Sequence, residues 1–352
     1  MAKAGLALGR GGERDTNMRR GVIGLFLGAW LAVSAFATTI GEAIEKFELV
    51  ELVNTLAAKK IDRLLPSSAT WIAPEDRAAA AVLLAIGIIE DSNLMAAADV
   101  ERKLDQEIKL IGGSAEEIVV SLDDVSALMR LANFGGHEKL RRAAKLTHAL
   151  DRAIAAEVLT GYGLRKPHVS AGTDPTRTVI YSHSSLPHVK QLVGLVASEG
   201  LRGEVYIAPK IAAFVFRDGW GERPEWINKL SPGLYVAQGP EMLVHFEFEN
   251  VSDRQRFDAL VNQYAKKDTE DETGNIIHSW WQPFYYGETS AEGYSEIHRV
   301  TLFSKHAEAS LLMLPERTKI VRSYFEDTTE GMVVDSIWVS APFYRFLQGD
   351  YK

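Results

Sequence analysis

Hydrophobic positions recur at helical spacing through the first part of the chain, from residue 38 to about residue 166. Thr39 and Glu42 have the spacing of a capping box, which predicts a helix that begins directly after them. Pro66 interrupts this first stretch, and Pro74 begins a second that continues into 78–89, a run of twelve residues without a polar side chain. Twelve residues are too few to cross a bilayer, but they suit a helix that other helices surround.

Further helical patterns follow over 100–111, 123–134 and 138–160. The last of these ends at Gly161-Tyr162-Gly163, where glycine is typical of a helix end. The sequence therefore predicts an all-helical bundle for residues 38–166.

The periodicity changes after a stretch rich in proline, glycine and small polar residues, 167–177, which is the predicted linker between two domains. A short β-branched run at 178–181 is followed by a second apolar run at 205–208, and between them lies a helical stripe at Val189, Leu192, Val193 and Val196. This order is typical of a strand–helix–strand unit.

A second unit of the same kind follows. Residues 242–249 alternate between large apolar side chains and a set made of Leu243, His245, Glu247 and Glu249, which predicts a strand with one buried face and one mostly wet face. A helical stripe ends at Tyr264, and 276–286 is the predicted returning strand. Two such units predict that 178–352 forms an α+β domain of the ferredoxin-like sandwich type, with helices on one face and the other face open.

The first 37 residues have the layout of a signal peptide preceded by a polar start. Arg19 and Arg20 precede an uncharged segment, 21–37, that ends in Ala35-Phe36-Ala37, an A-x-A cleavage site. The signal is therefore expected to span 18–37, with cleavage after Ala37 and export to the periplasm or the medium. An uncleaved membrane anchor is the alternative, and it would be the only membrane contact.

Composition narrows the classes of partner. Without residues 1–37 the chain keeps 34 basic and 45 acidic residues, a net charge of −11, which argues against binding to nucleic acid or anionic lipid. No cysteine is present, so disulfides, thiol nucleophiles and cysteine-held metals are excluded. No motif indicates a cofactor.

The turn between the first strand and its helix carries the main candidate side chains. Ser182, His183, Ser184, Ser185 and His188 lie where helix amides point toward a bound group, so the turn is expected to contact a ligand through His183, Ser185 and His188. A serine nucleophile, Ser184 or Ser185, with a histidine base is the catalytic alternative, but no G-x-S-x-G elbow and no orienting carboxylate accompany it. In the simplest interpretation Ser185 caps the helix and both histidines face water.

Two further sets of residues are candidates for binding. Trp280, Trp281 and Tyr286 concentrate aromatic rings on one segment and are predicted to contact a sugar or peptide ligand, although such rings are often core residues. His245, Glu247 and Glu249 share one strand face, as metal ligands do, but alternation alone produces such a row. No metal site is predicted.

These observations favour an exported two-domain protein that binds a ligand or a protein partner in the cell envelope, and they favour binding over enzymatic activity. The alternatives are a serine/histidine hydrolase that uses the 182–188 turn, and a structural subunit of an envelope assembly.

Export can be tested on the protein itself. We expect the mature chain, isolated from an exporting bacterial host, to begin at Thr38, because a signal peptidase cleaves after the second alanine of the A-x-A motif. Intact-mass and amino-terminal peptide mass spectrometry give the residue directly. A chain that begins at Met1 or Met18 would contradict cleavage.

Overall fold

The computed structural model describes residues 38–167, 172–217, 222–223, 225, 227–264, 284–326 and 330–350. The predicted signal segment lies outside these residues. In the described part of the chain, no helix combines the length and apolar character needed to span a bilayer.

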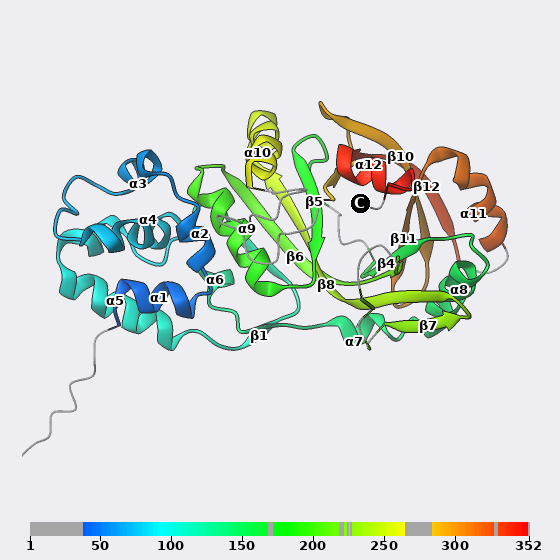
Figure 1. Ribbon diagram of the computed structural model, residues 1–352, viewed down its shortest axis with the longest axis horizontal. Helices are drawn as coiled ribbons and strands as arrows, with labels where there is room; N and C mark the ends of the chain where they lie inside the picture. Colours follow the sequence, from blue (N-terminus) through cyan, green and yellow to red (C-terminus); the bar gives the residue numbers. More distant parts are fainter. Residues whose placement is uncertain are drawn as a thin grey trace, which may run out of the picture. The chain divides into compact units, whose positions relative to one another are not determined.

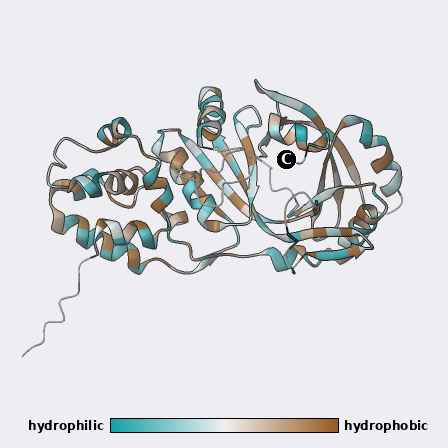
Figure 2. Ribbon diagram, viewed as in Figure 1, coloured by the Kyte–Doolittle hydropathy of each residue, from teal (hydrophilic) through white to brown (hydrophobic). Residues whose placement is uncertain are grey.

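Short helices make up residues 38–111. They are α1 (Ile40–Lys46), α2 (Val50–Asn54), α3 (Ala58–Leu64), α4 (Arg77–Ala85) and α5 (Ala97–Lys109), with 3₁₀ turns at Pro74–Asp76 and Asp91–Met95. Thr39 caps α1 and forms the reciprocal bond with Glu42 that defines a capping box. Hydrophobic residues concentrate in α4, brown in Figure 2, and five consecutive residues of this helix are buried.

The prediction of an all-helical bundle over 38–166 is wrong for its second half. That half contains β1 (Ser114–Ala115), β2 (Ile118–Ser121), α6 (Ser126–Met129), β3 (Asn133–Phe134), α7 (His137–Leu140), α8 (Ala144–Ala155) and β4 (Gly161–Arg165). Gly161 and Gly163 lie in a strand where space is short. A Cβ on Gly161 would lie 2.7 Å from the carbonyl oxygen of Ala213, and one on Gly163 would lie 2.9 Å from Cε of Lys210. Here glycine allows close approach and does not end a helix.

Eight antiparallel strands close into a barrel (Figure 1). In ring order they are β6 (Gly203–Val215), β4, β11 (Glu308–Met313), β10 (Tyr294–Phe303), β12 (Met332–Ser340), β9 (Tyr286–Gly287), β5 (Thr178–His183) and β8 (Leu234–Phe248), which pairs again with β6. β2 extends along β6 beside β4, and β7 (Asn228–Ser231) extends along β8.

The prediction of a ferredoxin-like sandwich is therefore wrong, although its first strand–helix–strand unit is present. β5, α9 (Leu186–Ser198) and β6 follow one another as expected, and β8 lies between the two strands. The sheet does not stop there, because β10, β11 and β12 connect β4 to β9 and complete the ring. The predicted open face becomes the inside of a barrel.

Helices cover the outside of the barrel. α9 and α10 (Val251–Tyr264) lie against the outward face of β5, β6 and β8, and α8 and α11 (Thr318–Phe325) cover strands farther along the ring (Figure 1). The α9 contacts belong to a hydrophobic cluster that also contains α4, so this core is continuous across the predicted linker at 167–177.

Closure buries the inward face of β8, which corrects the prediction of a wet face there. His245 and Leu243 lie on that face, and they are 0% and 1% exposed. At the chain end, α12 (Ala341–Leu347) packs against inward-facing apolar side chains in a separate small cluster.

Gly203, where β6 begins against β8, should be essential for closure. Its φ is +141°, and an added Cβ would lie 2.1 Å from the carbonyl oxygen of Glu247 and 2.8 Å from Cα of Phe248. We expect Gly203→Ala to reduce the free energy of unfolding by on the order of 3 kcal/mol in urea titrations, because backbone must move. A Cβ on Gly239 of β8 would meet no described atom within 4 Å, so Gly239→Ala is the matched control. Equal stability of the two variants would contradict this account.

Candidate functional site

Strand alternation divides the predicted turn between two faces of the sheet. Ser182 has the same parity on β5 as the inward-facing Ile180, and its hydroxyl oxygen accepts a hydrogen bond of 2.6 Å from Nζ of Lys210. His183 points to the opposite face, where Tyr181 packs against the helices. Residues that are neighbours in the sequence therefore belong to two environments.

On the helix-covered face, Ser185 caps α9 as predicted, and its hydroxyl accepts from the amide N–H of His188. The imidazoles of His183 and His188 stack with ring centroids 3.8 Å apart. His188 is 4% exposed and lies 3.3 Å from the Tyr181 hydroxyl, so the expectation that both histidines face water fails for His188. Nδ1 of His183 accepts from the amide of Ser185, and Ser184 is exposed. These contacts order the turn and give the Ser185 hydroxyl a capping role.

The aromatic candidates are placed only in part. Trp280 and Trp281 lie outside the described residues. Tyr286 is on β9, 8% exposed, and belongs to the inward cluster that contacts α12. Its ring is therefore inside the barrel and does not form a platform on the outer surface.

Three basic side chains inside the barrel form a site that the sequence did not predict. Arg165 of β4 and Arg299 of β10 are each 7% exposed, and His245 of β8 is fully buried. All three have inward parity on their strands, and the charges of both arginines act on His245. We call these three residues the interior cluster. The sequence signal for it is weak, because single basic residues at alternate strand positions also occur on strands that face water.

Arg299 is fully engaged. Its guanidinium donates to both carboxylate oxygens of Asp335 and to Oε1 of Glu288, at 2.8 Å from the latter. Burial acts to lower the pKa of Arg299, but the bonds to Asp335 and the charges of the two carboxylates outweigh it, and the pKa is raised. Arg299 therefore stays charged at every physiological pH.

Arg165 and His245 retain unused hydrogen-bonding capacity. Oε2 of Glu308 lies 3.4 Å from Nε of Arg165, an ion-pair distance, but the geometry does not make a hydrogen bond, and Nε and Nη1 both lack an acceptor among the described residues. Within the same part of the chain, neither ring nitrogen of His245 has a partner. Since a buried polar group without a partner costs about 1–3 kcal/mol, such groups indicate a place for water, an ion or a ligand.

The charges near His245 and its burial determine its protonation state. Burial, and then the positive charges of Arg165 and Arg299, lower the pKa of His245 to about 3. Its imidazole is thus neutral at pH 7 and offers one N–H. The carboxylates of Glu288, Glu308 and Asp335 offset the two guanidinium charges, so the groups left unmet among the described residues are the donors themselves. An oxyanion such as a carboxylate or phosphate would supply acceptors for these donors.

The same geometry argues against a metal at the His245, Glu247 and Glu249 row. Glu247 is bound to Arg177 at 2.8 Å, and His245 lies in the field of two cations. Among the residues that the structure describes, no group of three histidine or acidic side chains is arranged to hold a metal ion.

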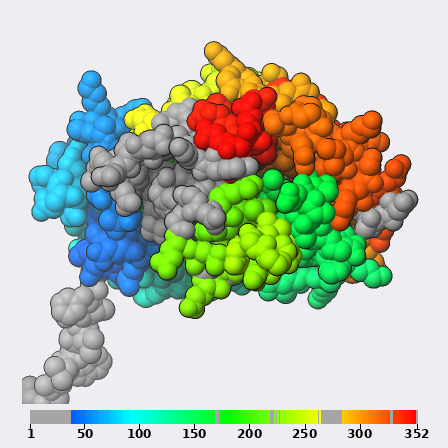
Figure 3. All heavy atoms as spheres, turned by 45° about the vertical axis from the view of Figure 1, so that its right-hand side comes forward, coloured from blue at the N-terminus to red at the C-terminus, as the bar shows by residue number. Residues whose placement is uncertain are grey.

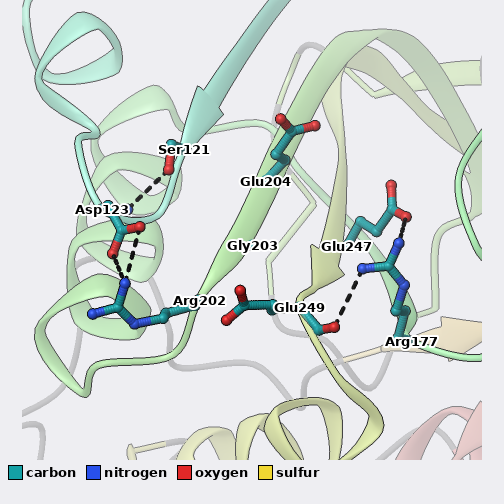
Figure 4. Close-up of a pocket in the computed structure, with 8 residues that line it drawn as sticks. All are labelled: Ser121, Asp123, Arg177, Arg202, Gly203, Glu204, Glu247 and Glu249. Carbon is teal, nitrogen blue, oxygen red and sulfur yellow. Dashed lines mark hydrogen bonds and ion pairs between the residues drawn. The ribbon is translucent and has the colours of Figure 1, made fainter.

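An open pocket lies near the ends of β2, β6 and β8 (Figure 4). Its volume is about 290 Å³, and its lining residues are Ser121, Asp123, Arg177, Arg202, Gly203, Glu204, Glu247 and Glu249. Both arginines are already paired, Arg202 with Asp123 and Arg177 with Glu247. The remaining carboxylates leave the pocket negative and exposed, whereas the residues of the interior cluster are buried.

No protein-family model matches the chain, and comparisons with curated proteins and with solved structures also found no match. Only the geometry of this chain therefore bears on its function.

The buried neutral His245 should make stability depend on pH. A histidine whose pKa is near 6.5 when unfolded and about 3 when folded binds its proton preferentially in the unfolded chain. The free energy of unfolding should therefore fall as pH falls below about 6.5, by about 2 kcal/mol at pH 5 from this group alone. Urea titrations at pH 7.5 and 5 should show this loss in the parent.

In His245→Gln the fall in the free energy of unfolding between pH 7.5 and 5 should be smaller by about 2 kcal/mol, whatever the absolute stability of that variant. His306 is exposed, so His306→Gln is the matched control and should keep the parent's dependence. The same pH dependence in His245→Gln and the parent would contradict the assignment.

Proposed function

We propose that this protein is a binding protein that encloses the oxyanion group of a small-molecule ligand inside its barrel, at the interior cluster. The observation that carries the proposal is the pair of buried groups with donors unused among the described residues, Nε and Nη1 of Arg165 and the imidazole of His245. Closed eight-stranded barrels either fill their interior with side chains or hold one small ligand. A charged interior with unmet donors favours the second case.

The position of Lys210 supports a binding role. Its ammonium group lies 3.0 Å from Oε2 of Glu241 and donates to Ser182, so these two partners neutralise and fix it within the barrel. Lys210 pairs with Arg165 across β4 and β6, and Glu308 faces Arg165 from β11. The Glu308 carboxylate, 3.4 Å from Nε, thus holds the Arg165 side chain in place, and a preorganised donor loses little entropy on binding.

The hydrolase alternative receives less support. A serine nucleophile needs a hydrogen bond to a base. The Ser185 hydroxyl accepts from the backbone amide of His188 and caps α9, and Ser184 is exposed. Ser182 accepts from Lys210, whose charge Glu241 offsets, so that serine is bound to an ammonium group rather than to a free base. No observation specifically favours a structural subunit of an assembly.

Export to the cell envelope is part of the proposal. The amide nitrogen of Thr38 donates to Oδ1 of Asp105 at 2.9 Å. Cleavage after Ala37 would turn that nitrogen into an ammonium group facing the carboxylate, so the folded protein has a partner for the new amino terminus. Envelope ligands with carboxylate or phosphate groups would be the natural candidates.

Oxyanion binding can be tested by thermal unfolding of the full chain with inorganic phosphate, sulfate or acetate. At least one should raise the Tm of the parent, because a ligand that prefers the native state adds about 2.7 kcal/mol at 100 times its Kd. Arg165→Met combined with Glu308→Gln should abolish the increase. The double variant removes the donors without leaving the 3%-exposed Glu308 carboxylate opposite a lost cation.

The control is Arg102→Met, because Arg102 is an exposed arginine that pairs with Asp99 on α5. This variant should keep the parent's response to each anion. An increase that survives in the double variant, or the absence of any increase in the parent, would refute the proposed site.

A further inference from the structure

α12 contacts the inside of the barrel rather than its outer wall. Phe343, Tyr344 and Leu347 pack against six inward-facing residues, which we call the apolar floor: Ile180, Leu243, Tyr286, Ile297, Ile337 and Val339. The floor residues come from five strands of the ring, and α12 lies against β10 and β12. Phe284 also stacks on Phe343, with centroids 4.7 Å apart.

The apolar floor is continuous with charged positions. On β8, Leu243 of the floor is followed on the same face by His245, and on β10, Ile297 is followed by Arg299. On β12, Ile337 is preceded by Asp335, which binds Arg299. Positions two apart lie about 6.6–6.8 Å apart on one face of a strand. The apolar floor therefore borders two members of the interior cluster, His245 and Arg299, on the same inward face.

α12 is a short helix whose contact residues are only partly covered. It has seven residues, far fewer than the about 12–15 that an isolated helix needs to be stable in water. Its contact residues Phe343, Tyr344 and Leu347 stay partly exposed, and the residues after it, 348–350, are exposed. Figure 3 shows the carboxy-terminal segment, drawn in red, on the molecular surface. Packing on the apolar floor and its neighbours is what keeps this helix folded.

We infer that the ligand is amphipathic, with an oxyanion at one end and an apolar chain, and that this chain displaces α12 from the apolar floor. The inference rests on the proposed oxyanion site. Side chains of α12 now occupy the space that the chain would take, and an alkyl chain offers the floor the same kind of contact. α12 is thus a cap that the ligand's apolar chain displaces from the apolar floor.

The test compares octanoate, acetate and 1-octanol, each below its aggregation limit, by isothermal titration calorimetry with the full chain. Octanoate should bind at least tenfold more tightly than acetate, and 1-octanol should bind more weakly than octanoate. Amide hydrogen exchange should accelerate in 341–347 when octanoate is bound and stay unchanged with acetate. The increase in exchange reports displacement of α12 independently of affinity.

Variants of α12 test whether this helix competes with the ligand's apolar chain. Phe343→Ala combined with Leu347→Ala weakens the competitor and should raise octanoate affinity at least threefold, with acetate affinity unchanged. Arg345→Ala changes an exposed residue of the same helix that pairs with Asp350, and it should behave as the parent.

The outcomes distinguish the two proposals. If acetate or phosphate binds through Arg165 but octanoate binds no more tightly and α12 exchange is unchanged, the amphipathic ligand is refuted and the oxyanion site stands. If octanoate affinity is the same in the Arg165→Met/Glu308→Gln variant as in the parent, and no small anion binds, both fail.

Discussion

The ladder between β6 and β8 is the constraint on which the rest of the fold depends. Thirteen residue pairs run from Gly203 opposite Phe248 to Val215 opposite Val236. The other edge of β6 pairs first with β2 and then with β4, and the other edge of β8 pairs with β5 and β7. These two strands are long enough to pair with β2 and β5 near one end and with β4 and β7 near the other, and the strands from β4 round to β5 close the ring on them.

Closure changes the environment of every inward-facing side chain. In an open sheet one face can stay in water, but in a ring of eight strands that face becomes an interior from which water is largely excluded. Inward carboxylates and cations are then stabilised by pairing with each other, as Arg299 pairs with Asp335 and Lys210 with Glu241. Where the pairing among the described residues is incomplete, at Arg165 and His245, the unsatisfied atoms identify the place that a ligand can complete.

The sequence predicts the parts of the fold that local pattern controls. The 178–208 strand–helix–strand unit, the Ser185 cap and the Thr39–Glu42 capping box follow from spacing within a few residues. Closure depends on pairing between strands far apart in the chain, and alternation is the same whether the second face meets water or a barrel interior. For this reason the pattern predicts a wet His245, and the glycines of β4 resemble a helix end. The interior cluster needs three strands in register, so no single motif contains it.

Stability alone does not account for the interior cluster. The apolar floor shows that this chain can fill part of its barrel with isoleucine, leucine and valine, and replacing a buried ion pair with well-packed apolar residues is often neutral or stabilising by about 1–4 kcal/mol. A barrel that needed only to fold would extend the floor through Arg165, His245 and Arg299. It instead keeps a buried charge at Arg165 and a buried imidazole at His245 whose hydrogen-bonding groups the described residues leave unmet. An oxyanion bound as proposed would offset that cost, and a ligand with one charged end would match the contrast between the apolar floor and the interior cluster.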